Sequence, residues 1–216
     1  MKIEIKNVNK VINKVEILKD VSANLESGKI YGFVGINGSG KTMLMRCICG
    51  LILPSLGEVS IDGEIIGKDI DFPRSVGVLI ENPGIIPYYN GFENLKEISS
   101  IKGKVSDDRI REVLEEVGLD PDDKRKVRKY SLGMKQKLGI ALAFLENPDL
   151  IIIDEPYNAL DTASREKLTK MIMNAKNRGA LVIVSCHDQN IIDNIADEIV
   201  EIENGEIINV KTAIVQ

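Results

Sequence analysis

The segment from residue 35 to residue 42 constrains the fold more than any other part of the sequence. It reads Gly-Ile-Asn-Gly-Ser-Gly-Lys-Thr and fits the pattern Gly-x-x-x-x-Gly-Lys-Ser/Thr. The apolar run Lys29–Val34 before it is typical of a strand, and Leu44, Ile48 and Leu51 after it have helical spacing. A glycine-rich turn between a strand and a helix lets successive backbone N–H groups converge on an anion. The segment therefore predicts a phosphate-binding loop.

The side chains of this loop have separate predicted tasks. Glycine is needed where the backbone must come close to a phosphate. We expect Lys41 to neutralise the β- and γ-phosphates of a nucleotide, and the Thr42 hydroxyl to ligate Mg²⁺, which prefers hard oxygen ligands. The residues expected to bind the nucleotide here are Gly35, Asn37, Gly38, Ser39, Gly40, Lys41 and Thr42.

A second signal follows the apolar run Leu150–Ile153, which leads directly into Asp154 and Glu155. Proteins with parallel sheets bind their ligands at the carboxyl ends of the strands. We expect Asp154 to hold Mg²⁺, and Glu155 to orient or deprotonate a water that attacks the γ-phosphate. Many strands end in solvated acids, so this prediction depends on the phosphate loop being present in the same chain.

The remaining sequence predicts an α/β fold. Leu150–Ile153 and Ala180–Cys186 have the composition of buried strands, and Ala163–Arg178 between them has that of a helix. This alternation favours a mainly parallel sheet flanked by helices. Turns at Asp62-Gly63 and Asn204-Gly205 predict two hairpins outside that pattern.

The middle of the chain, from about residue 88 to residue 146, predicts mostly helices. Ser106 can cap a helix in which Ile110, Val113 and Leu114 share one face, and Leu132–Leu145 is a further helix candidate. We interpret this segment as a helical lobe inserted between the two halves of one core.

Composition excludes several other classes of protein. Apolar residues make up 44% and charged residues 28% of 216 residues, which is typical of one globular domain. No apolar stretch approaches the roughly 18–20 residues of a membrane-spanning helix, and the start of the chain has no apolar signal core, so we expect a cytoplasmic protein. Three cysteines predict buried or free thiols, and a net charge of −5 disfavours a nucleic-acid partner.

Three further segments carry a family resemblance: Tyr130–Gln136, reading Tyr-Ser-Leu-Gly-Met-Lys-Gln, then Asn158–Asp161 and Val182–His187. With the phosphate loop and the Asp-Glu pair, they make nearly the whole chain similar to the ATP-binding cassette (ABC) family. The resemblance implies an α/β P-loop NTPase (RecA-like) core with an antiparallel β subdomain at residues 1–81 and 147–216. It implies an inserted helical subdomain at residues 82–146.

The resemblance also implies roles for residues outside the two nucleotide motifs. Ser131 and Gly133 match the family signature Leu-Ser-Gly-Gly-Gln, which would face the γ-phosphate of ATP held by a second subunit. Asp161 would belong to the D-loop, and His187 would be the switch histidine that contacts the γ-phosphate.

Tyr130, Leu132 and Met134 depart from the family signature, and two positions outside it depart from the family pattern as well. Glu81 stands where the Q-loop has glutamine; a carboxylate can ligate Mg²⁺ but adds negative charge near the phosphates. Ile12 stands where an aromatic ring would stack on adenine, and it lacks that ring's π-system.

As a member of this family, the chain would be the ATP-binding, ATP-hydrolysing subunit of an ABC transporter. It would act with Mg²⁺ as a homodimer or as a heterodimer with a related subunit, at the inner face of the membrane beside a separate permease. Tyr130–Met134 with Glu81 resembles the subset linked to bacitracin resistance and lantibiotic immunity. The alternatives are a soluble ABC ATPase acting in translation or DNA maintenance, and a P-loop kinase or GTPase.

Three aromatic residues shortly after Glu81 have two interpretations. Tyr88, Tyr89 and Phe92 could line a groove that receives a helix of the permease, or they could pack in the core of the helical lobe. The sequence leaves both open.

Overall fold

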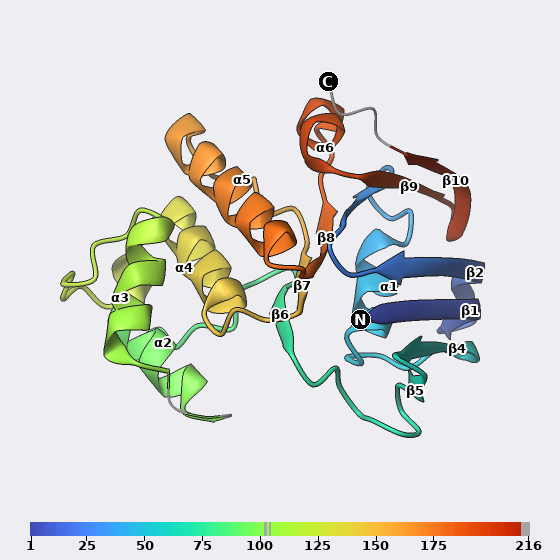
Figure 1. The fold of residues 1–216 in the computed structure, drawn as a ribbon, viewed down its shortest axis with the longest axis horizontal. Coiled ribbons are helices and arrows are strands. Elements are labelled where there is room, and N and C mark those ends of the chain that lie inside the picture. Colours follow the sequence, from blue (N-terminus) through green and yellow to red (C-terminus); the bar gives the residue numbers. More distant parts are fainter. Residues whose placement is uncertain (102, 104, 213–216) are drawn as a thin grey trace.

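Two β-sheets of different construction form the framework of the chain (Figure 1). The computed structural model describes residues 1–101, 103 and 105–212, and in it six strands form a mainly parallel sheet in the order β10-β9-β3-β8-β7-β6. Four antiparallel strands form the second sheet, in the order β2-β1-β4-β5. Residues 102 and 104 of the expected helical subdomain, and residues 213–216 of the expected core, lie outside the described residues.

The strands of the chain are β1 (Lys2–Ile12), β2 (Val15–Glu26), β3 (Ile30–Val34), β4 (Leu56–Ile61), β5 (Glu64–Ile65), β6 (Val76–Leu79), β7 (Leu150–Ile153), β8 (Leu181–Ser185), β9 (Glu198–Glu203) and β10 (Glu206–Thr212). The helices are α1 (Lys41–Ile48), α2 (Gly91–Ser99), α3 (Asp107–Glu116), α4 (Leu132–Phe144), α5 (Thr162–Asn177) and α6 (Gln189–Ile195), with one 3₁₀ turn at Val127–Lys129.

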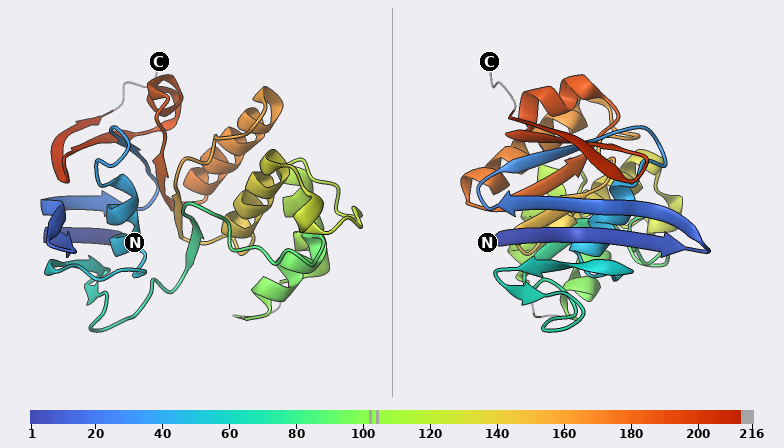
Figure 2. Two further views of the ribbon diagram at one scale, coloured as in Figure 1. Left: turned by 180° about the vertical axis from the view of Figure 1, so that it is seen from behind. Right: turned by 90° about the vertical axis from the view of Figure 1, so that its right-hand side faces the viewer.

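The central strands β3, β7 and β8 are buried at every position because both faces of their sheet are covered. Along β7, Leu150 and Ile152 pack on the side of α1, whereas Ile151 and Ile153 pack on the side of α4 and α5. Such continuous apolar runs are expected of a parallel strand buried on both faces. Helix α1 is enclosed between the two sheets, as Figure 2 shows. The predicted α/β class with an added antiparallel sheet is therefore confirmed.

Helices α2, α3 and α4 lie between β6 and β7 in the chain and on the side of the parallel sheet away from the antiparallel sheet (Figures 1 and 2). Ser106 caps α3, and Ile110, Val113 and Leu114 are buried on one face of this helix, as the sequence predicts. The hydrophobic core continues from the sheet into these helices. The subdomain boundaries at residues 82 and 147 stay a prediction.

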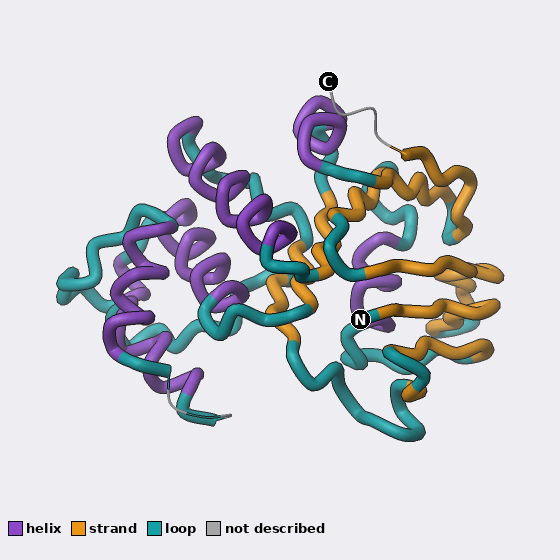
Figure 3. Tube along the Cα trace, viewed as in Figure 1, coloured by secondary structure: helices purple, strands orange, loops and turns teal. Residues whose placement is uncertain are grey.

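Two parts of the fold differ from expectation (Figure 3). Strand β2 was not predicted, although it pairs with β1 along most of its length. Leu51 was expected on the helix after the phosphate loop, but α1 ends at Ile48 and the Leu51 side chain is exposed. Gly50, with φ 78°, has the left-handed conformation that ends a helix, so residue 51 lies beyond it.

The cysteines behave as the sequence predicts. Cys47, Cys49 and Cys186 are all buried and free. Burial raises the pKa of the Cys47 thiol to about 11, so this thiol stays protonated and unreactive near neutral pH. Among the described residues, no helix combines the length and the apolar character needed to cross a bilayer.

Candidate functional site

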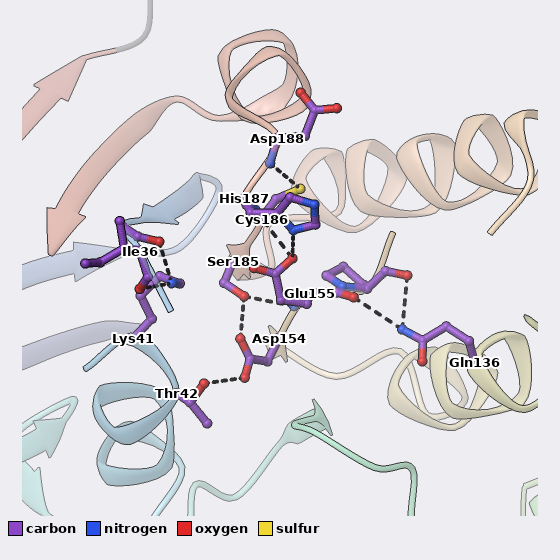
Figure 4. Close-up of polar contacts among 12 residues, drawn as sticks. Ile36, Lys41, Thr42, Gln136, Asp154, Glu155, Ser185, Cys186, His187 and Asp188 are labelled. Carbon is purple, nitrogen blue, oxygen red and sulfur yellow. Dashed lines mark hydrogen bonds and ion pairs between the residues drawn. The ribbon is translucent and has the colours of Figure 1, made fainter. Parts of the chain in front are cut away.

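The phosphate loop connects the carboxyl end of β3 to the start of α1, in the middle of the parallel sheet. Strand β3 is paired on both sides, with β8 and β9, so the loop rises from a fixed position. Lys41 is 6% exposed, and its Nζ donates hydrogen bonds to the carbonyls of Gly35 at 2.7 Å and Ile36 at 3.1 Å (Figure 4). The ammonium group is therefore held against the backbone of its own loop.

Two glycines of the loop are required for different reasons. At Gly35, with φ 151°, a Cβ would lie 2.1 Å from the Ile202 carbonyl oxygen of β9, so close packing excludes any side chain. At Gly38, with φ 82°, a Cβ would meet nothing within 4 Å, so the backbone is open on that side. The loop thus packs tightly against the sheet at its base and leaves its tip accessible to an anion.

Asp154, the first carboxylate of the Asp-Glu pair, connects strands β7 and β8 of the sheet with helix α1. The Thr42 hydroxyl of α1 donates a hydrogen bond of 2.6 Å to Oδ2 of Asp154, which follows β7. The hydroxyl of Ser185, at the end of β8, donates to the other oxygen of Asp154. Asp154 is only 8% exposed, so these two donors keep its carboxylate satisfied and fixed.

Ser185 is a site residue that sequence reasoning missed. Its oxygen also accepts the backbone N–H of Glu155 at 2.8 Å, so one hydroxyl orients both members of the Asp-Glu pair. Ser185 is completely buried at the end of the apolar strand β8. A polar residue ending such a strand, next to the single histidine, is the signal that could have identified it.

We predict that Ser185→Ala lowers the free energy of unfolding by about 1–3 kcal/mol, because it leaves Asp154 without one donor and the Glu155 N–H without its acceptor. Thermal or urea unfolding measures this change. Ser99→Ala is the matched control, since within the described part of the chain the buried Ser99 hydroxyl bonds only to the Lys96 carbonyl of its own helix. Equal stability losses in the two variants would contradict the orienting role of Ser185.

The second carboxylate contacts the only histidine. Oε2 of Glu155 lies 2.8 Å from Nδ1 of His187, which follows β8 (Figure 4). Glu155 has φ 48°, in the left-handed region, and its position is fixed by the bond to Ser185. The structure thus brings together Lys41 and Thr42 of the loop, the pair Asp154 and Glu155, and His187.

Unsatisfied polar atoms indicate where a ligand fits. Among the described residues, only Ser39 Oγ and Glu155 Oε1 are buried side-chain polar atoms without a hydrogen-bond partner. Buried polar groups are nearly always paired, so such exceptions need an explanation. Both atoms belong to the predicted site, and a phosphate group with its attacking water would satisfy them.

The donor set suits Mg²⁺ better than a transition metal. Within the described part of the chain, no three His, Cys, Asp or Glu side chains are grouped closely enough to hold a metal ion. Mg²⁺ is usually held by one or two carboxylates together with substrate phosphates and water. The Thr42 hydroxyl and the Asp154 carboxylate, in contact with each other, fit that kind of site.

Five expected site residues lie outside this cluster: Ile12, Ser131, Gly133, Asp161 and Glu81. Ile12 ends strand β1 and is 36% exposed. Ser131 caps α4, where its Oγ accepts the Met134 N–H at 3.2 Å. Asp161 caps α5, and hydrogen bonds from the Ser164 hydroxyl and N–H hold the pKa of Asp161 below its usual value.

The signature segment contacts the loop after Glu155 within the same chain. A Cβ on Gly133 would lie 2.7 Å from the Ala159 carbonyl oxygen, so close packing by itself already requires glycine at this position. Gln136, one helical turn further, donates to the Pro156 carbonyl at 3.1 Å. Sequence reasoning missed this contact, which connects the helical lobe to the residues directly after Glu155.

Glu81 forms an ion pair with Arg46, a contact that the sequence did not suggest. Its Oε2 lies 2.7 Å from Nη2 of Arg46 on α1. Glu81 has φ 58° and lies two residues beyond the end of β6. Its expected role as a Mg²⁺ ligand stays a prediction.

The parallel sheet, the phosphate loop and the buried Asp154 with its Thr42 contact define a P-loop nucleotide hydrolase. Comparison with known proteins identifies the family. The model of the ABC transporter family matches residues 18–158. The chain belongs to this family and is the ATP-binding, ATP-hydrolysing subunit of an ABC transporter.

Several relatives match nearly the whole chain. It is 43% identical over 95% of its length to the uncharacterized ABC transporter ATP-binding protein YybJ of Bacillus subtilis, covering 94% of that protein. It is 36% identical over 95% of its length to the lantibiotic transport ATP-binding protein SrtF of Streptococcus pyogenes, covering 89% of SrtF. It is 37% identical over 94% of its length to the bacitracin transport ATP-binding protein BcrA of Bacillus licheniformis, covering 67% of BcrA.

A solved structure shares the complete fold. The ATP-binding cassette MJ0796, in a dimeric post-hydrolysis state bound to ADP and Pi, superposes with a TM-score of 0.87 and 26% identity. The superposition covers 98% of this chain and 99% of the cassette. These relatives favour the transporter ATPase over a soluble ABC ATPase of translation or DNA maintenance.

Proposed function

We propose that this chain binds ATP with Mg²⁺ and hydrolyses it at an interface between two subunits, and thereby drives a separate permease that moves antimicrobial peptides. The observation that carries the proposal is the continuous set of contacts from Thr42 through Asp154, Ser185 and Glu155 to His187. These contacts support the proposal because they fix Asp154, the carboxylate proposed to bind Mg²⁺, and Glu155, the proposed general base, beside one phosphate loop.

In this proposal the loop residues hold the triphosphate. Backbone N–H groups from Gly35 to Lys41 bind phosphate oxygens, and the Lys41 ammonium neutralises the β- and γ-phosphates. When bound, Mg²⁺ would neutralise the charge that develops on the β- and γ-phosphate oxygens. The Thr42 hydroxyl and Asp154 would hold the ion, and Ser185 keeps Asp154 in place.

Glu155 acts on the attacking water. Its free oxygen, Oε1, is buried without a partner and is placed to accept a proton from that water. The water oxygen attacks the γ-phosphorus in line, the bond from the γ-phosphorus to the bridging oxygen breaks, and the electron pair stays on ADP. His187 contacts Oε2 of Glu155, and in this proposal it also contacts the γ-phosphate.

We predict that His187→Ala lowers kcat about 10- to 100-fold, because one hydrogen bond to a charged group contributes about 1.5–3 kcal/mol. The Kd for MgATP should change much less, since the loop residues are untouched. Steady-state ATPase assays and calorimetry measure the two quantities. His187→Gln, which can still donate to Glu155, should retain more activity, and unchanged kcat in His187→Ala would contradict the role.

The second subunit supplies Ser131 and Gly133, which lie outside the cluster. Ser131 and Gly133 begin helix α4, whose N-terminus carries a partial positive charge suited to a γ-phosphate. In the proposed dimer they close over ATP held by the opposite phosphate loop, with Asp161 at the interface and Ile12 against the adenine. The dimeric state of MJ0796 supports this arrangement. The partner is a second copy or a related subunit.

A groove on the helical lobe is the proposed contact with the permease. It has a volume of about 410 Å³, and half of its lining residues are apolar, among them Pro83, Ile85, Pro87 and Val127. Tyr88 is 70% exposed beside it, with Arg128 over its ring, whereas Phe92 packs against the core. Docking here would place the chain at the cytoplasmic face of the membrane.

The substrate class rests on SrtF and BcrA, named for lantibiotic and bacitracin transport. The test is to tag the chain in its native host and identify the polytopic protein that co-purifies from detergent-solubilised membranes. Cells that produce wild-type chain should then tolerate more bacitracin or lantibiotic than cells that produce Glu155→Gln. Capture of ribosomes or DNA-repair proteins, with no membrane partner, would instead support the soluble alternative.

A further inference from the structure

The ion pair between Glu81 and Arg46 has no part in the mechanism above. Glu81 follows β6, and Asp154 follows β7; the two strands are parallel neighbours in which Leu79 pairs with Ile153. The two carboxylates therefore belong to the same edge of the sheet. Two negative charges at one edge would repel a polyphosphate unless a cation balances one of them.

Helix α1 supplies that cation. Thr42 and Arg46 are four residues apart, so they share one face of the helix. Thr42 contacts Asp154 at 2.6 Å, and Arg46 contacts Glu81 at 2.7 Å. One helical face thus meets both carboxylates: a hydroxyl binds the first, and a guanidinium neutralises the second.

Stability alone does not explain this pair. The Arg46 side chain is 29% exposed and that of Glu81 57% exposed, and ion pairs at such positions contribute little to folding. Glu81 also has a left-handed backbone conformation, which residues other than glycine rarely adopt. The contact with Arg46 holds its carboxylate in one place despite that conformation.

We propose that Arg46 is a positioning residue that neutralises Glu81. The nucleotide site, which has glutamate at position 81, then has the same net charge as a site with glutamine at that position. This inference rests on the proposed function, in which the edge formed by Asp154 and Glu81 faces a Mg²⁺-bound triphosphate. ATP without metal carries more negative charge than MgATP. An unbalanced carboxylate at this edge should therefore weaken the binding of metal-free ATP more than the binding of MgATP.

The test is the ratio of two dissociation constants: that of ATP in EDTA and that of MgATP, both measured by calorimetry. Arg46→Met keeps the apolar stem and removes the charge, so the ratio should rise about three- to tenfold. Arg46→Lys should stay near wild type. The double variant Arg46→Met/Glu81→Gln restores charge balance and keeps an oxygen ligand, so its ratio should also return to wild type.

Two results would overturn the inference. The ratio in Arg46→Met could equal that of wild type, or the double variant could remain as altered as Arg46→Met, which would show that Arg46 acts independently of Glu81. Thermal unfolding confirms that each variant is folded. A wild-type chain that binds no adenine nucleotide would contradict the proposed function itself and is recognised in the first titration.

Discussion

Replacing Glu155 with glutamine is expected to lower the rate of ATP hydrolysis by about 10²–10⁴-fold, the usual contribution of a general base. Glutamine keeps the shape of the side chain and an oxygen for His187, but it cannot accept a proton from water. ATP binding should remain, because Lys41, Thr42 and Asp154 are unchanged. Single-turnover hydrolysis of radiolabelled ATP measures the loss of the chemical step directly.

The control for this prediction is an exposed carboxylate away from the site. Glu166 lies on the exposed face of α5, so Glu166→Gln should hydrolyse ATP at the wild-type rate. The unsatisfied Oε1 of Glu155 is the proposed proton acceptor, and Glu155→Gln removes this function. Hydrolysis by Glu155→Gln at a rate within threefold of Glu166→Gln would remove Glu155 from the role of base.

Replacing Lys41 with alanine should weaken ATP binding about 100-fold, because the charged hydrogen bonds between an ammonium and phosphate contribute about 3 kcal/mol. The same change removes the bonds from Nζ to the carbonyls of Gly35 and Ile36, so the loop also loses its internal support. Calorimetric titration with MgATP gives the dissociation constant.

Lys68→Ala is the matched control, since Lys68 is exposed in a loop. Its affinity for MgATP should equal that of wild type, which separates a local effect of Lys41 from a change in net charge. Thermal unfolding checks that both variants are folded. If Lys41→Ala bound MgATP as tightly as Lys68→Ala, the phosphate site would lie elsewhere on the molecule.

Much of the fold follows from local patterns in the sequence. The runs that became β3, β7 and β8 are apolar except for Ser185 at the end of β8, which indicates strands buried on both faces. The chain leaves each of these strands at the same edge of the sheet. For that reason the phosphate loop, the Asp-Glu pair and His187 could be expected to meet there.

Strand β2 shows where local patterns are insufficient. The pairing of β1 with β2 has register shifts between Ile5 and Val8 and again between Val8 and Lys10, and Asn7 and Asp20 have positive φ. Such bulges shift the alternation of apolar and polar residues from one face to the other. The two-residue period that identifies a strand is therefore broken within it.

The contacts that sequence reasoning missed all depend on how elements far apart in the sequence pack together. Ser185 reaches Asp154 because β8 lies beside β7. Arg46 reaches Glu81 because α1 packs on the face of the sheet formed by β6 and β7. Gln136 reaches Pro156 because α4 packs against the loop after β7. No periodicity within one segment encodes such neighbours.

The central claim is that MgATP held by one phosphate loop is closed in by a second subunit. The most direct measurement is the mass of Glu155→Gln by light scattering, with ATP and Mg²⁺ and then with ATP and EDTA. We predict about twice the chain mass of 23.9 kDa with Mg²⁺, and the single-chain mass with EDTA, if the second subunit is another copy of this chain. A mass that stays at 23.9 kDa at saturating MgATP would contradict closure by a second copy.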